Sequence, residues 1–316
     1  MKIVLISFLI LGLMLGFVRS QASPLNQHPA HAALTFPAGR FCDATILNNR
    51  HVLTAAACGL DLFNNQRLNP NVYSLFVGML NVPTAGGIPI SHIYIHEHYN
   101  PFDVHWNNIA VFRTAIDIPL NPIAPGTIIQ PVVMHNRIMP DNAVCFLVGW
   151  NSAPQHLTTP LQRQQQNIFN RAACNVLPII AGTLTDSNIC AGAVANNPNP
   201  CPNHPGGALY CLVEGTDRLV AIMSHNRRCG QNNAPGVYTQ LRFYQDWIAR
   251  QLIRTDATPP GPTPPPGHPG FGTVANKTLI LPNKILSYLN DRIWVRDAFI
   301  ESIVCCVVEN PCGSCR

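Results

Sequence analysis

Residues 51–60 read HVLTAAACGL, a short apolar run that ends in a cysteine, a glycine and a leucine. A second cysteine lies upstream at Cys42. The segment 53–58 has the form of a frame that presents one residue, and the residue in that place is Ala57. Its methyl group can neither transfer a proton nor act as a nucleophile. We therefore ask why the sequence keeps a frame around a residue without reactive chemistry.

The composition describes a globular chain with little charge. Of its 316 residues, 47% are apolar and 11% are charged, and the formal net charge is +5. This length allows one large domain or two smaller ones with a sizeable core. Lysine and arginine do not gather in runs, which argues against nucleic acid as a partner.

The N-terminus has the features of a secretory signal peptide. Lys2 precedes the apolar run IVLISFLILGLMLGF, and small residues follow at Ser20 and Ala22. We therefore expect a signal peptide over residues 1–20, with cleavage after residue 20 or 22, and a secreted, extracellular protein. The alternative of a membrane anchor is less favoured because the run is short for a bilayer span. The 12 cysteines indicate disulfides in such a compartment.

Short apolar runs broken by proline, glycine and asparagine fill the middle of the chain. Examples are VYSLFVGML at 72–80, ISHIYI at 90–95, AVCFLVGW at 143–150 and RLVAIMS at 218–224. These are strand lengths with turn signals between them, so the pattern predicts an all-β sandwich or barrel.

The C-terminal third is divided by composition. The run FYQDWIARQLIR at 243–254 predicts a helix, because Tyr244, Trp247, Ile248 and Leu252 fall on one face. A proline-rich linker is expected over residues 256–272, and a cysteine-containing tail over residues 273–316. The tail is too short for a large core and needs disulfides or docking for stability. The sequon at Asn276 predicts a glycan.

Four motifs together resemble the landmarks of the chymotrypsin-like (trypsin-fold, S1-type) serine protease family. They are LTAAAC at 53–58, NNIAVFR at 107–113, CPNHPGGALYC at 201–211 and PGVYTQLRFYQDWI at 235–248, in the family's order. The resemblance covers roughly residues 28–254 and places the domain at 23–255. It implies two six-stranded antiparallel Greek-key barrels followed by a C-terminal helix.

The resemblance also implies a disulfide pattern. The implied pairs are Cys42–Cys58, Cys145–Cys211, Cys174–Cys190 and Cys201–Cys229. The four tail cysteines have no counterpart in it, and their pairing stays open between bonds within the tail and bonds between two tails. They are Cys305, Cys306, Cys312 and Cys315. A redox role for the C-x-x-C spacing would need a thioredoxin-like context that the sequence does not show.

Residue by residue, the resemblance implies that the catalytic triad is lost. The positions of the family's His, Asp and Ser hold Ala57, Asn108 and Pro205. Without base, acid and nucleophile the serine-protease mechanism cannot run. Proline also lacks the backbone N–H that the family uses in its oxyanion hole, and the second donor position is Asn203.

The activation device and the substrate cleft depart from the family as well. The family's ion pair between a new N-terminus and an Asp is missing, because His204 replaces that Asp and no I-V-G-G run precedes Cys42. We therefore expect the chain to fold directly into its working form. Asn199 lies at the floor of the implied specificity pocket, and residues 224–226 replace the family's S-W-G. A rebuilt site using His204, His105, Asp103 or Ser224 is disfavoured because no nucleophile is in place.

Two clusters carry possible binding functions. His92, His96 and His98 would share one face of a strand, but a histidine-containing turn typical of the family explains them better than a metal site. We expect no metal and no cofactor. Arg242, Arg250 and Arg254 line the terminal helix and indicate a possible site for heparin-like polyanions; the alternative is a solvated face with favourable helix-end charges.

The leading hypothesis is a secreted, inactive serine protease homologue with no enzyme activity. It would act as a cofactor, adaptor or decoy, bound to a protease or a protease substrate, in extracellular defence or haemostasis-like cascades. The alternative is a polyanion- or microbial-surface-binding protein, as in antimicrobial members of the family, with no protease partner. A third hypothesis gives the working role to the tail.

Overall fold

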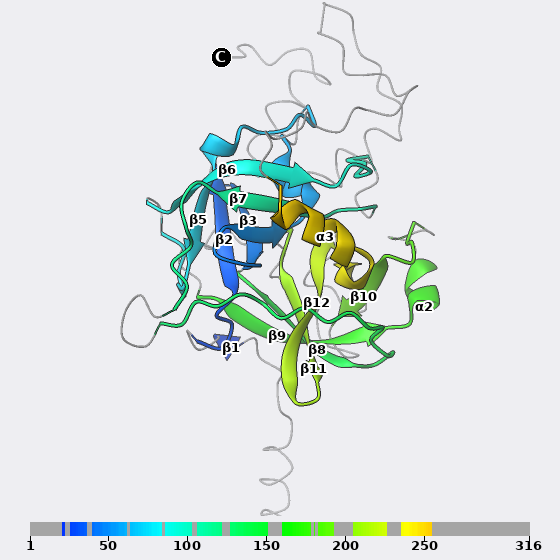
Figure 1. Cartoon of the computed structure of the whole chain (residues 1–316). Helices are drawn as coiled ribbons and strands as arrows, with labels where there is room; N and C mark the ends of the chain where they lie inside the picture. The colour runs from blue at the N-terminus through cyan, green and yellow to red at the C-terminus, as the bar shows by residue number, and fades with distance from the viewer. Residues whose placement is uncertain are drawn as a thin grey trace, which may run out of the picture. The chain divides into compact units, whose positions relative to one another are not determined.

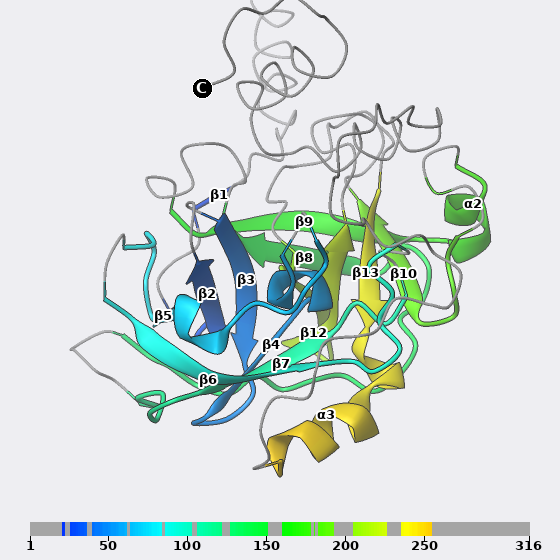
Figure 2. The same ribbon diagram turned by 90° about the horizontal axis from the view of Figure 1, so that it is seen from above.

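The structure is a computed structural model of the whole chain, and its described part forms two β-barrels (Figures 1 and 2). The described residues are 21–22, 26–36, 40–61, 64–83, 86–102, 106–121, 127–150, 160–177, 180, 183–192, 205–225 and 235–254. The predicted signal peptide, linker and tail and the sequon at Asn276 lie outside these ranges, as do Asp103, His105 and residues 193–204. No helix within the described ranges is long and apolar enough to cross a membrane.

The first barrel is antiparallel and closed. Its strands are β2 (His31–Phe36), β3 (Arg40–Ile46), β4 (His51–Thr54), β5 (Ser74–Val77), β6 (Ile88–Ile95) and β7 (Ala110–Thr114), and they close in the order β2-β3-β4-β7-β6-β5. Alternate residues fill the interior, as Leu34 and Ala44 show, because successive side chains on a strand point to opposite faces. The other faces of β2 and β3 are buried too: Ala33 and Phe41 pack in a cluster shared with the second barrel.

The second barrel is also antiparallel. Its strands are β8 (Val144–Gly149), β9 (Gln162–Phe169), β10 (Asn188–Gly192), β11 (Ala208–Val213), β12 (Thr216–His225) and β13 (Gly236–Gln240), with β1 (Gln21–Ala22) added beside β9. Pairing of β8 with β9 closes the ring. Glu214 and Gly215 join β11 to β12 with positive φ at both residues, which suits the right-handed twist of a two-residue hairpin.

Helices are few and short in the part of the chain that the structure describes. They are the 3₁₀ helices η1 (Ala56–Gly59), η2 (Pro70–Val72) and η3 (Leu241–Phe243) and the α-helices α2 (Arg171–Asn175) and α3 (Gln245–Leu252). The predicted helix at 243–254 is confirmed as α3, but it begins later because η3 takes its first residue. Trp247 and Ile248 are buried as expected. Gln251 joins them, and its Nε2 donates to the backbone oxygen of Trp247.

The fold predicted from the sequence is confirmed: the described part is mostly strand, in two six-stranded barrels with a C-terminal helix. The strands expected around 72–80, 90–95, 143–150 and 218–224 are β5, β6, β8 and β12. Disulfides join Cys42 to Cys58, Cys145 to Cys211 and Cys174 to Cys190. The fourth implied pair, Cys201–Cys229, lies outside the described residues.

Candidate functional site

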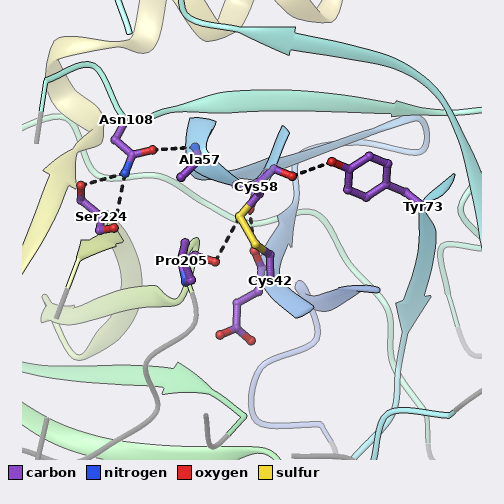
Figure 3. The surroundings of a disulfide bond; sticks show 9 residues. Cys42, Ala57, Cys58, Tyr73, Asn108, Pro205 and Ser224 are labelled. Carbon is purple, nitrogen blue, oxygen red and sulfur yellow. Dashed lines mark hydrogen bonds between the residues drawn. A yellow bond between two sulfur atoms is a disulfide. The ribbon is translucent and has the colours of Figure 1, made fainter. Parts of the chain in front are cut away.

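Asn108 lies at the centre of the candidate site, just before β7, and is fully buried. Its Oδ1 accepts a hydrogen bond from the backbone N–H of Ala57 at 3.0 Å. Its Nδ2 donates to the backbone oxygen of Ser224 at 3.3 Å and lies 2.9 Å from the Ser224 hydroxyl oxygen (Figure 3). The amide therefore joins η1 of the first barrel to β12 of the second.

The backbone of Asn108 is held as firmly as its side chain. The preceding residue, Asn107, has φ of 49°, a left-handed conformation that asparagine tolerates better than most residues. Thr239 of β13 donates its hydroxyl to the Asn108 carbonyl oxygen at 3.2 Å. Hydrogen bonds to η1, β12 and β13 thus fix the position of Asn108.

Ala57 and Pro205 face the same region from opposite barrels (Figure 3). Ala57 is half-buried in η1, next to Cys58, whose carbonyl oxygen accepts the Tyr73 hydroxyl at 2.6 Å. The Pro205 carbonyl oxygen accepts the Asp43 N–H at 3.1 Å. It also lies 3.6 Å from Cys58 Sγ, which carries no hydrogen because it is in a disulfide. The fold therefore brings together Ala57, Asn108 and Pro205, as the motif comparison expects.

The three side chains offer a methyl group, an amide and a pyrrolidine ring. None of them titrates near neutral pH, and none is a nucleophile. Ser224 is 3% exposed, and its hydroxyl oxygen lies against the Asn108 amide (Figure 3). The arrangement can hold the two barrels together, but these groups supply neither a general base nor an attacking atom.

Similarity to known proteins follows the fold. The model of the family described as Trypsin matches residues 17–248. The chain belongs to the trypsin family. Transmembrane protease serine 11C of Mus musculus is 28% identical over 228 residues, covering 71% of this chain and 50% of that protein. Serine protease 41 of Homo sapiens is 29% identical over 253 residues, covering 75% of this chain and 76% of that protein.

A third relative is Transmembrane protease serine 11B of Homo sapiens, 26% identical over 234 residues, with 73% of this chain and 54% of that protein covered. The chain thus spans about half the length of two of these three trypsin-family relatives. All three carry the name of a serine protease.

The arginines proposed from the sequence do not form one row. Arg250 and Arg254 lie on and just after α3, and Arg254 lies over the Tyr94 ring at 5.0 Å. Burial, together with the nearby charge of Arg254, lowers the pKa of Arg67 to about 10. Arg242 instead belongs to η3, where its Nε donates to Gln240 and its guanidinium covers Phe243. Sequence reasoning missed Arg67 because a loop far away in the chain brings it to the helix.

The strand-face alternative for the histidines of the run 90–100 is wrong, because β6 ends at Ile95. Residues 97–98 form a turn, in line with the preferred interpretation, and the Tyr99 N–H donates to the His96 carbonyl oxygen at 3.0 Å. His92 stacks on Tyr94, whereas His96 lies between Tyr244 and Trp247. Burial lowers the pKa of His96 to about 4, and Arg250 contributes to the shift. Among the described residues, no three histidine, cysteine, aspartate or glutamate side chains are placed to hold a metal ion.

The sequence analysis also missed a buried acid beside the site. Asp43 is fully buried in β3, and His31 of β2 lies against it. The available signal was an aspartate inside the apolar run RFCDATI of β3. The neighbouring strand β2, HAALTF, carries His31 two residues from Ala33, the residue that pairs with Asp43. A charged side chain in such a strand is rare unless it is paired.

Proposed function

We propose that this trypsin-family protein is secreted and non-catalytic and that it binds another macromolecule. Its role would be that of a cofactor, adaptor or decoy in an extracellular protease cascade of the defence or haemostasis type, with a protease or protease substrate as partner. The observation that carries the proposal is the buried amide of Asn108. Its oxygen accepts the Ala57 N–H and its Nδ2 donates to Ser224, so the amide holds structural elements together.

Charge and donors support the proposal. In the serine-protease mechanism a buried carboxylate stabilises the imidazolium that forms when histidine takes the proton from serine. An amide has no charge for that task, and Ala57 has no imidazole. Pro205 has no backbone N–H to give to an oxyanion, and the loss of one such donor costs about 2.7–4 kcal/mol of transition-state stabilisation.

The first test is catalytic. The full-length, disulfide-bonded protein is incubated with peptide and ester substrates and with a fluorophosphonate probe for activated serines. We expect no turnover and no labelling. Hydrolysis that copurifies with the protein and is abolished by a change at Ser224 would overturn the proposal.

The second test concerns binding. Full-length protein with a photo-cross-linker placed at Ala57 is incubated in the native extracellular fluid and compared with a cross-linker at Ile138, an exposed residue of a loop before β8. We expect a protease or a protease substrate to be captured from position 57 and purified partner to bind saturably. No partner from either position, or equal capture from both, would contradict a site-directed role.

A second candidate function is direct binding of a heparin-like polyanion or an anionic microbial surface. The specific observation in its favour is that Arg67, Arg250 and Arg254 gather from a loop and from α3. Binding through such a cluster weakens steeply with salt. The double variant Arg250→Ala/Arg254→Ala should lose heparin-column retention, while Arg137→Ala/Arg242→Ala, with the same change in net charge, should keep it. Equal loss in both variants would indicate attraction by net charge alone.

A further inference from the structure

A buried acid–base pair lies between the two barrels. Asp43 of β3 is 0% exposed and His31 of β2 is 3% exposed, and His31 Nε2 lies 3.0 Å from Asp43 Oδ1. The His31 ring also packs on Trp150, at 5.1 Å between ring centroids. Such a pair is costly to bury, so its position calls for a physical reason.

The carboxyl group of Asp43 reaches across to the end of β8. The backbone N–H of Trp150 hydrogen-bonds to it. A Cβ added at Gly149 would lie 2.7 Å from Asp43 Oδ2, so the carboxyl group packs directly on the backbone of the second barrel. Only a glycine leaves room for this contact.

The backbone of Asp43 holds the segment that contains Pro205. The Asp43 N–H donates to the Pro205 carbonyl oxygen at 3.1 Å, and the Asp43 carbonyl oxygen accepts the Thr54 hydroxyl at 2.7 Å. Gly206 has φ of 88°, and a Cβ there would lie 2.1 Å from the Asp43 oxygen. The segment therefore touches β3 more closely than any side chain would permit.

We propose that Asp43, oriented by His31, is a positioning residue that fixes the segment Pro205–Gly206 of the second barrel from within the first barrel. The side chain anchors β3 to β8, and the backbone of the same residue anchors the segment. This internal latch needs no inserted chain terminus. It does not depend on whether the protein is catalytic or on which partner it binds.

The protonation states fit a hydrogen-bonded latch better than an ion pair. Burial raises the pKa of the Asp43 carboxyl well above its ordinary value, and burial lowers the pKa of His31 to about 3. Both shifts favour the neutral forms. A neutral amide at position 43 should therefore preserve the latch, whereas a methyl group should not.

Hydrogen exchange of the full-length protein tests the latch, because the Gly206 N–H donates to the Met223 oxygen and reports on the segment. Loss of one buried hydrogen bond of the latch should make amide exchange in the segment about tenfold faster or more. We expect Asp43→Ala to accelerate exchange at Gly206 by about that factor relative to strand β6, and Asp43→Asn to stay near wild type.

Leu34→Ala is the matched control, since it removes buried contacts on the face of β2 and β3 that points into the first barrel, opposite to the face that carries Asp43. If Leu34→Ala accelerates Gly206 as much as Asp43→Ala does, or if Asp43→Ala leaves Gly206 unchanged, the proposal is wrong. Should Asp43→Ala fail to fold, the pair His31→Leu and His31→Gln replaces it. Selective acceleration in the leucine variant with recovery in the glutamine variant supports the latch, and equal behaviour of the two contradicts it.

Discussion

At the scale of single residues, Asn108 shows how an amide changes the chemistry of a site without disturbing its frame. Its side-chain oxygen accepts the backbone N–H of Ala57, and its side-chain nitrogen donates to the backbone oxygen of Ser224. A carboxylate accepts only, so it could not make the bond to the Ser224 carbonyl oxygen. The residue that removes a charge from the site is thus also the residue best matched to its present surroundings.

Asn108→Asp should lower the free energy of unfolding by about 1–3 kcal/mol, because a buried acceptor would face the Ser224 oxygen without a proton between them. The protonated acid can donate as the amide does, so the folded-state pKa of the new carboxyl should lie above its unfolded value. The loss should therefore be small below pH 4 and grow as pH rises. Urea unfolding at pH 4.5 and 8 measures this loss of stability. Asn69→Asp, the same change at an exposed position, should show no loss that grows with pH.

Two glycines beside Asp43 should respond differently to removal of its side chain. Gly149→Ala places a Cβ against the carboxyl group, whereas Gly206→Ala places it against the Asp43 backbone. We expect both single variants to destabilise the protein by about 1–3 kcal/mol. Adding Asp43→Ala should relieve the strain at position 149 but not that at position 206. Double-mutant cycles of thermal unfolding test this, and equal coupling for both pairs would contradict the contacts described.

At the scale of secondary-structure elements, α3 is stabilised by packing rather than by its own length. It has 8 residues, too few to be stable alone in water. Trp247 and Ile248 pack in the cluster that joins the two barrels, and Trp247 Nε1 donates to Glu97 at 2.8 Å.

The two isoleucines of the helix region give a matched comparison. Ile248 is 1% exposed and Ile253 is 80% exposed. Ile248→Ala should cost about 2–5 kcal/mol of stability because it removes buried methyl groups and leaves a cavity. Ile253→Ala should change stability by no more than about 0.5 kcal/mol. Chemical denaturation monitored by tryptophan fluorescence distinguishes them, and similar losses would mean that the helix is placed differently.

The strands and α3 could be predicted because their signals are local. The runs at 90–95 and 143–150 have strand length, and the residues of α3 repeat at helical spacing. The candidate site residues Ala57, Asn108 and Pro205 could be proposed because each stands in a motif of its own. Arg67 and the pair His31–Asp43 were missed because their roles depend on which strands and loops meet in space. The contact of His96 with Trp247 of α3 was missed for the same reason. His96 lies one residue after the end of β6, so the strand pattern did not predict its position.

At the scale of the whole molecule, buried histidines should make the fold sensitive to acid. Burial lowers the pKa of His28 to about 3; interactions with His31 and with the positive charge of Arg163 act in the same direction, and Asp217 opposes the shift. The pKa of His51 is lowered to about 4 by burial and by the charges of Arg113 and Arg50. These folded-state values lie below the ordinary value near 6.5, so the unfolded chain binds more protons as pH falls.

Stability should therefore decline from about pH 6.5 downward, by roughly 1.4 kcal/mol per pH unit for each buried histidine that resists protonation. The raised pKa of Asp43 opposes this, because the folded state keeps that proton at higher pH. Thermal unfolding between pH 7 and 4.5 measures the slope, and His31→Gln should reduce it by about one proton. A flat profile over this range would contradict the buried positions of these histidines.

The bonding of Asn108 also has a consequence for evolution. A change to aspartate at this position alone would weaken the fold, and a histidine at position 57 or a serine at position 205 alone would still lack the other two members of a Ser-His-Asp triad. No single substitution on the way to a Ser-His-Asp triad would therefore be favoured by selection. The hydrogen bonds of Asn108 thus set an order on sequence change: such a triad would require several of these positions to change together.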